Sequence, residues 1–182
     1  MGEALVVVFA DEFHSGIVLG KADVPPRLLP EQVKAPWAVV HFGERRWIRG
    51  EADGLCDALR LGLSSGDGGV QVDMIDWWVH GRGGTDRSRI RVWAFPVTRT
   101  ELAGLQARLD SWVVAGATRE EIRPGSCWWL ASNAWTLGTN CHDFTVDLLH
   151  GAGIPVAQPP IMWAGPLRAA LDRAWAERDQ PR

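Results

Sequence analysis

Hydrophobic residues alternate with polar ones, or run together in β-branched blocks, over several short stretches of the chain. Runs rich in valine, isoleucine and phenylalanine, bounded by glycine, proline, aspartate or serine, are typical of strands. They occupy residues 4–10, 14–20, 37–42, 70–75 and 90–95, and residues 45–48 are expected to form a short hairpin partner of 37–42. This succession favours an antiparallel sheet.

Helical signals lie between and after these runs. Thr98 and Glu101 form a capping-box pattern that predicts a helix to about residue 115. Thr139 and Asn140 are favoured N-cap residues for another helix, which ends at Gly151. Two further helices are predicted over residues 53–63 and 165–177. Together the elements predict one α+β domain over residues 1–182, with helices packed on the sheet.

Composition and charge exclude several classes of protein. The 182 residues are 46% hydrophobic and 23% charged, which is ordinary for a globular chain, and the net charge of −3 lacks the basic surplus of a nucleic-acid-binding protein. The apolar run at residues 4–10 is too short to span a bilayer. We therefore expect no nucleic-acid partner, no membrane span, and a cytoplasmic location as given, or a periplasmic or secreted one if an export leader has been removed.

Three cysteines, Cys56, Cys127 and Cys141, stand at irregular spacing. They form neither a disulfide framework nor a metal-ligand pattern with the histidines, so no metal and no cofactor are expected. Cys141 is distinctive because it falls in the first turn of a predicted helix, where unpaired N–H groups and the helix dipole lower the pKa of a thiol. The alternative interpretation is a small, buried apolar side chain.

Two histidines are candidates for the base that a cysteine nucleophile needs. His14 opens a strand and is followed by Ser15 and Gly16, which are small enough to leave room for a neighbouring helix. His41 interrupts the next, otherwise apolar strand. If the two strands pair, the imidazoles face each other, and a helix packed on that face brings Cys141 to them. The alternatives are a turn residue for His14 and a core or edge residue for His41.

Three segments carry a family resemblance: Phe-His14-Ser-Gly-Ile-Val-Leu, Val-Val-His41-Phe-Gly-Glu and Thr-Asn140-Cys141-His-Asp-Phe. In this order they resemble the circularly permuted branch of the NlpC-type, papain-like thiol hydrolases, the superfamily that includes lecithin–retinol acyltransferase. More narrowly, the chain is similar to an uncharacterised bacterial family often encoded near urease genes. The residues shared with that family include Asp23, Phe42-Gly43-Glu44 and Ala152-Gly153-Ile154-Pro155, and the likeness covers roughly residues 5–165.

The resemblance implies a permuted papain-like fold in which Cys141 attacks a carbonyl carbon, His14 acts as general base and then acid, and His41 orients His14. The Cys141 backbone N–H, helped by Asn140, is expected to stabilise the oxyanion. The family has a longer acidic turn after Phe-Gly and often carries glutamate at the position of His41. Glu44 therefore stays open as an alternative third member.

Four further residues are candidates for the surroundings of the site. His142 and Asp143 follow the nucleophile directly, but neighbours on a helix point roughly 100° apart, so a position at the cleft rim or surface is expected. Trp128 and Trp129 are expected to flank the cleft and contact substrate, with core packing as the alternative for at least one of them.

The expected activity is that of a cysteine-dependent hydrolase or acyltransferase, related to the thiol proteases, on an amide or ester bond of a peptide, a small amide or a lipid ester. A cell-wall peptide is the leading substrate by family analogy. The alternative is a catalytically silent papain-like module that binds a peptide or lipid and has an inert Cys141. A third possibility, a structural partner in an assembly, would expose Trp77 and Trp78 in a surface patch.

Overall fold

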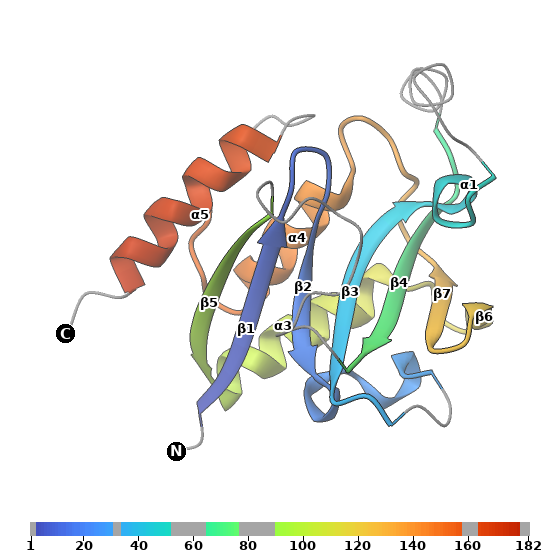
Figure 1. Ribbon diagram of the computed structural model, residues 1–182, viewed down its shortest axis with the longest axis horizontal. Coiled ribbons are helices and arrows are strands. Elements are labelled where there is room, and N and C mark those ends of the chain that lie inside the picture. Colours follow the sequence, from blue (N-terminus) through green and yellow to red (C-terminus); the bar gives the residue numbers. More distant parts are fainter. Residues whose placement is uncertain (1–2, 31–33, 52–64, 77–89, 158–163, 179–182) are drawn as a thin grey trace.

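A computed structural model of the chain describes residues 3–30, 34–51, 65–76, 90–157 and 164–178. At its centre is a seven-stranded antiparallel sheet with the strand order β5-β1-β2-β3-β4-β7-β6 (Figure 1). The strands are β1 (Glu3–Ala10), β2 (Ser15–Gly20), β3 (Trp37–Glu44), β4 (Gly68–Ile75), β5 (Arg91–Thr98), β6 (Glu120–Arg123) and β7 (Ser126–Leu130). The predicted α+β class and the antiparallel sheet are confirmed.

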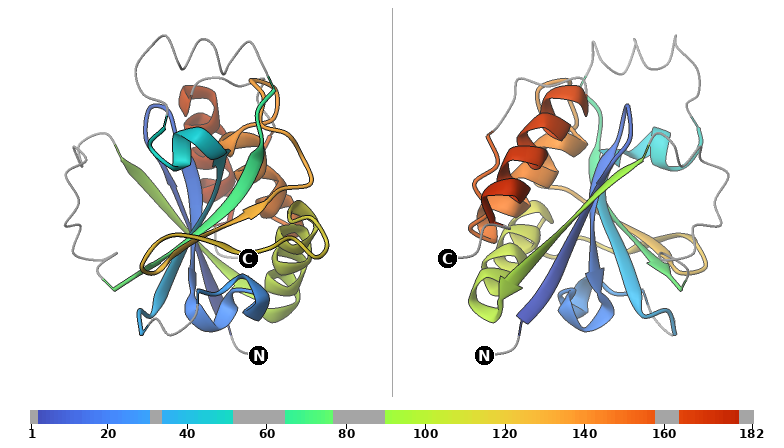
Figure 2. Two further views of the ribbon diagram at one scale, coloured as in Figure 1. Left: turned by 90° about the vertical axis from the view of Figure 1, so that its right-hand side faces the viewer. Right: turned by 60° about the vertical axis from the view of Figure 1, so that its left-hand side comes forward.

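Three helices lie on one face of the twisted sheet, as Figure 2 shows. They are α3 (Arg99–Trp112), α4 (Cys141–Gly151) and α5 (Ala164–Arg178). The predicted capping box of Thr98 and Glu101 is formed at the start of α3. The fourth described helix, α1 (Arg45–Ile48), is a single turn at the end of β3, and two short 3-10 turns, η1 (Lys21–Asp23) and η2 (Pro26–Leu28), follow β2.

The hydrophobic core lies between the sheet and helices α3, α4 and α5. Side chains along each strand point alternately to the two faces of the sheet, and those on the helix side form the core. On β3, Val40 and Phe42 are fully buried. Phe42 contacts Trp112 of α3 and Phe144 of α4, with ring centroids 5.0 and 5.9 Å away, and Trp112 lies 5.0 Å from Phe144. This aromatic cluster fixes both helices against the middle of the sheet.

Two predicted segments differ from the structure. Residues 45–48 form α1 rather than a strand, because the Glu44 carboxylate accepts a hydrogen bond from the Trp47 N–H and caps a helical turn. Residues 123–130, which are not among the predicted strands, belong to the β6–β7 hairpin, which turns at Gly125 with φ of 80°. The predicted helix at 53–63 lies outside the described residues.

Candidate functional site

Cys141 is the first residue of α4, as the sequence predicts, because its neighbours cap that helix. The Asn140 side chain accepts a hydrogen bond from the His142 N–H at 2.8 Å, and the Asp143 carboxylate accepts one from the Asn140 N–H at 3.1 Å. These bonds satisfy two N–H groups at the helix start. The Asn140 side-chain amide also donates to the carbonyl oxygen of Leu137, so at least one of its N–H bonds is engaged in the preceding loop.

The Cys141 thiol is confined against the turn between β1 and β2. The residue is 8% exposed, and Sγ lies 3.8 Å from the carbonyl oxygen of Phe13. Burial raises the pKa of the thiol to about 11, and the charge of Asp11 acts in the same direction, whereas backbone N–H groups, with that of Ser15 foremost, oppose the shift. The expectation of a lowered pKa is wrong for this arrangement, because desolvation of the thiolate outweighs its stabilisation at the helix start.

His14 and His41 contact each other across the paired strands β2 and β3. The Nε2 atom of His14 lies 2.9 Å from Nδ1 of His41, and the two rings are nearly perpendicular, at 80°. The Nε2 atom of His41 in turn lies 2.9 Å from Oδ2 of Asp73 on β4. The β3–β4 register places Gln71 opposite His41, and Asp73 is the next residue on the same face. His14, His41 and Asp73 thus form a chain of three side chains linked by hydrogen bonds.

Asp73 is the member of this chain that sequence reasoning missed. Burial alone would raise the pKa of its carboxyl group, but hydrogen bonds from His41, Ser126 and Gln71 and the charge of His41 outweigh burial and hold the pKa well below its usual range. The signal was present in the alternation of Gln71 and Asp73 with the apolar residues of their strand. That pattern shows two polar side chains on one face, but only the strand order shows that the face is the one carrying His41.

The imidazole of His14 is neutral in the folded protein. Burial lowers its pKa to about 3, repulsion from His41 and His142 acts in the same direction, and the attraction of Asp73 opposes the shift. A neutral imidazole has one nitrogen that can accept a proton, although a pKa this far below neutrality makes His14 a weaker base than an ordinary imidazole.

Folding stability is expected to fall as the pH is lowered from about 6.5 to 4.5. The unfolded chain protonates His14 near its ordinary pKa of about 6.5, whereas the folded chain resists protonation until about 3, so acid favours the unfolded state. We expect a loss of about 1–3 kcal/mol over this interval from His14, measured by urea unfolding at several pH values. His142, whose pKa burial also lowers, contributes with the same sign.

The matched variant for this measurement is His14→Asn, which removes the titrating group and keeps a polar side chain. Its stability should depend less steeply on pH than that of the wild type. Equal slopes in the two proteins would contradict the depressed pKa of His14.

The thiol and the histidine pair come from opposite faces of the sheet. Because Val40 and Phe42 point toward α4, alternation turns His41 away from it, so α4 is not packed on the histidine face as the sequence suggested. The connection is the turn at residues 11–14, where Phe13 touches the thiol and His14 follows directly. No hydrogen bond joins His14 to Cys141, both of which the structure describes.

Of the two small residues after His14, one has a role different from the expected one. A Cβ atom at Gly16 would lie 2.8 Å from the ring of Phe9 and 2.9 Å from the carbonyl oxygen of Val40, so this glycine accommodates the neighbouring strands. Ser15 faces α4, and its hydroxyl oxygen lies 3.1 Å from the carbonyl oxygen of Cys141. Only Ser15 therefore makes room for the helix.

A further histidine lies beside the thiol. His142 is 1% exposed, and its Nδ1 atom lies 3.8 Å from Sγ of Cys141 and 2.9 Å from the Ser15 hydroxyl, which also contacts Thr145 at 3.0 Å. The expectation of a surface position is wrong for His142, because the first turn of α4 lies against the start of β2. Asp143 is half-buried and serves as part of the helix cap.

Glu44, the alternative third member of the site, is directed elsewhere. Its side chain is almost fully buried, and the carboxylate accepts the hydrogen bond from the Trp47 N–H at 3.0 Å that caps α1. Of the two alternatives, His41 is the residue in contact with His14.

Trp128 and Trp129 are both buried, on opposite faces of β7. Trp129 belongs to the core between the sheet and the helices. Trp128 covers Gly69 of β4, where a Cβ atom would collide with the indole ring, and the guanidinium group of Arg45 lies 5.2 Å from the ring centroid. These contacts give both side chains a packing role, and no interaction between described residues joins either to Cys141.

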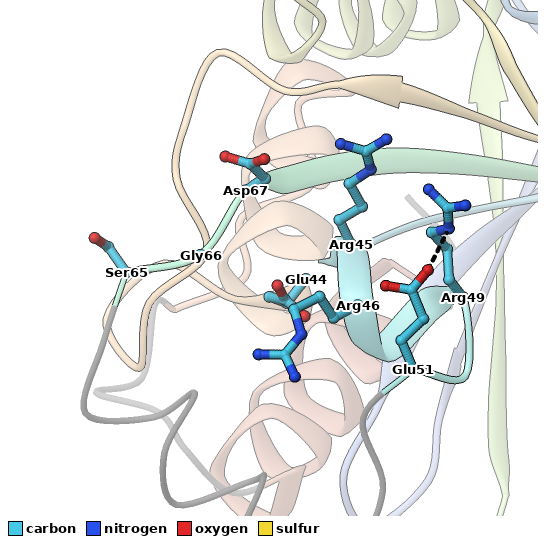
Figure 3. Close-up of a pocket in the computed structure, with 8 residues that line it drawn as sticks. All are labelled: Glu44, Arg45, Arg46, Arg49, Glu51, Ser65, Gly66 and Asp67. Atoms are coloured by element: carbon cyan, nitrogen blue, oxygen red, sulfur yellow. Dashed lines mark ion pairs between the residues drawn. The ribbon is translucent and has the colours of Figure 1, made fainter.

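A cavity of about 420 Å³ lies beside α1. Its lining residues do not include Cys141 or any of His14, His41 and Asp73. Its charged residues are Arg45, Arg46, Arg49, Glu44, Glu51 and Asp67. Figure 3 shows Arg45 and Arg49 extending to the same side and Arg46 to the opposite side, so the three guanidinium groups do not converge on one centre. Arg45 and Arg49 are ion-paired with Glu120, at 3.0 and 2.8 Å. The positive charges here are balanced by acidic groups and do not form an anion site.

No family model, no curated protein and no solved structure matches the chain, so the site is interpreted from its geometry alone. Within the described ranges, no helix has both the length and the apolar character needed to cross a bilayer. The same ranges contain no group of three or more His, Cys, Asp or Glu side chains arranged to hold a metal ion.

Proposed function

We propose that this chain is a cysteine-dependent hydrolase or acyltransferase for an amide or ester bond, with a permuted papain-like arrangement of Cys141, His14 and His41. The observation that carries the proposal is the position of the thiol. Its sulfur lies 3.8 Å from the carbonyl oxygen of Phe13, the residue before His14, and His14 is held 2.9 Å from His41. The thiol and the two imidazoles, to which the proposal gives the roles of nucleophile, base and orienting group, thus lie near the same end of the sheet, on its opposite faces.

In the proposed reaction, His14 removes the thiol proton of Cys141 while the sulfur forms a bond to the carbonyl carbon of the substrate. The oxyanion develops at the N-terminus of α4, where the Cys141 N–H and the helix dipole favour negative charge, since the N–H groups of Asn140 and His142 are used in the helix cap. His14 then gives the proton to the leaving amine or alcohol as the C–N or C–O bond breaks. Water or a second acceptor releases the acyl group from the sulfur.

The thiol and the imidazole are both neutral before substrate binds, because burial disfavours the charged form of each. In the proposal the proton therefore moves together with the attack on the carbonyl carbon, rather than resting on a preformed imidazolium. Since Cys141 is 8% exposed and no hydrogen bond joins it to His14, the proposal requires that the turn at residues 11–14 shift, both to admit substrate and to bring His14 within reach of the sulfur.

A catalytically silent binding module is the second candidate, and the burial of the thiol favours it. A neutral, covered cysteine is the form expected of a structural residue rather than of a reactive one. Such a module would retain the fold around Cys141 and hold a peptide or lipid without forming a covalent bond.

Acylation by a simple activated ester distinguishes the two candidates. The protein is incubated with p-nitrophenyl acetate near neutral pH, and each cysteine is analysed by peptide mass spectrometry. We expect an acetyl thioester at Cys141 that forms faster than at Cys127, which is buried in the core, and p-nitrophenol release that Cys141→Ala abolishes. Acetylation of Cys141 no faster than that of Cys127 would overturn the enzyme proposal and leave the binding module.

A further inference from the structure

Asp73 is held by groups from three strands. Its Oδ1 and Oδ2 atoms each lie 2.9 Å from the side-chain nitrogen of Gln71, and Oδ1 lies 3.4 Å from a guanidinium nitrogen of Arg123. The Gln71 side chain also donates to the Ser126 hydroxyl at 3.0 Å. Every one of these neighbours can donate a hydrogen bond, so the site is built for an ionised carboxylate, which only accepts.

The carboxylate determines which nitrogen of each imidazole carries the proton. Asp73 can only accept, so Nε2 of His41 must donate to it at 2.9 Å. If His41 is neutral, it has a single N–H, and its Nδ1 atom is then an acceptor. Across the 2.9 Å contact, Nε2 of His14 must then be the donor, and Nδ1 of His14 is left without a proton.

We propose that Asp73 is a positioning residue that acts through His41 to fix His14 as its Nε2–H tautomer, so that Nδ1 of His14 is the atom that accepts the thiol proton. This inference rests on the proposed function for the identity of the proton donor, but the tautomers themselves are a property of the folded chain. Asp73 touches neither the thiol nor a substrate in this proposal.

Replacing Asp73 by asparagine is expected to reverse the chain of donors. An asparagine has one acceptor oxygen. Gln71 lies 2.9 Å from both oxygen positions and does not select between the two orientations of the asparagine. Arg123 contacts only the Oδ1 position, at 3.4 Å, and can only donate, whereas His41 can also accept, so the oxygen is expected at Oδ1 and the amide group at Oδ2, facing His41. Nε2 of His41 must then accept, Nδ1 of His41 donates to His14, and the proton of His14 moves to Nδ1. The nitrogen proposed to act as the base is blocked.

The test is a long-range proton–nitrogen NMR spectrum of ¹⁵N-histidine-labelled protein near neutral pH, which distinguishes the two tautomers of each histidine. In the wild type we expect Nε2–H for both His14 and His41, and in Asp73→Asn we expect Nδ1–H for both. Asp110→Asn is the matched control, because Asp110 pairs with Arg27 on the exposed side of α3. It should leave both tautomers unchanged.

The wild-type spectrum alone can overturn the proposal. An Nδ1–H tautomer of His14 in the wild type would do so even if Asp73→Asn did not fold, and so would identical His14 tautomers in wild type and in a folded Asp73→Asn. Recording the same spectra in Cys141→Ala keeps this result separate from the proposed function, because the tautomers do not depend on acylation.

The kinetic counterpart is the acetylation rate of Cys141. Asp73→Asn is expected to lower it by about 10²–10⁴-fold, the usual contribution of a general base, while Asp110→Asn leaves it near the wild-type rate. A tautomer shift in Asp73→Asn without a loss of rate would overturn the role of Asp73 in positioning the base.

Discussion

Replacing His14 by alanine is expected to lower the rate of Cys141 acetylation by about 10²–10⁴-fold, because a neutral thiol reacts slowly unless a positioned base takes its proton. The effect should be large here because the pKa of Cys141 is raised to about 11, which leaves very little thiolate at neutral pH. The measurement is the initial rate of thioester formation by mass spectrometry, with a thermal unfolding curve to verify that the variant is folded.

His150→Ala is the matched control for this experiment. His150 lies at the other end of the same helix, where its Nε2 atom contacts the carbonyl oxygen of Val156 at 2.7 Å, and it touches none of the site residues. Its removal should cost some stability but leave acetylation near the wild-type rate. If Cys141 is acetylated equally fast in His14→Ala and in His150→Ala, then His14 is not the base.

Gly104→Ala is expected to destabilise the protein by about 1–3 kcal/mol, although alanine is the better helix former. Helices α3 and α4 cross closely at this glycine: a Cβ atom there would lie 2.1 Å from the carbonyl oxygen of Gly151. Backbone cannot yield as a flexible side chain can, so the helices must separate and loosen the aromatic cluster of Phe42, Trp112 and Phe144. Urea unfolding should show a lower midpoint with an unchanged slope.

The control is the same substitution on another helix. Gly165 lies near the start of α5, and a Cβ atom there meets nothing within 4 Å. Gly165→Ala should therefore leave stability unchanged or raise it by up to about 1 kcal/mol, from helix propensity alone. A loss at Gly165 as large as that at Gly104 would show that the close helix crossing is not the cause.

Most of the secondary structure could be predicted because its signals are local. The capping boxes at Thr98 and Asn140 satisfy N–H groups within one helical turn, and both are formed as their residue types indicate. The strand predicted at residues 45–48 is wrong for an equally local reason. The Glu44 side chain caps a helical turn there, and the prediction did not take this cap into account. The true partner of β3 on that side is β4, which begins 24 residues after β3 ends, at Gly68.

The pairing of His14 with His41 could also be anticipated, because it requires only that two neighbouring strands pair with matching faces. The position of His142 could not. A residue at the start of a helix is buried or exposed according to which face of that helix meets the sheet, and here the packing of Phe144 against Phe42 sets that rotation. The same packing places α4 on the face opposite His41.

The sequence by itself determined the strands and helices, the start of α4 at Cys141 and the histidine that precedes β2, because each depends on side chains a few residues apart. Only the tertiary structure decided that Asp73 completes the chain from His14 through His41, since that contact depends on the register between two strands. It also decided the ionisation of the thiol. Helix position alone lowers a cysteine pKa, but burial by distant segments raises it, and at Cys141 burial is the larger effect.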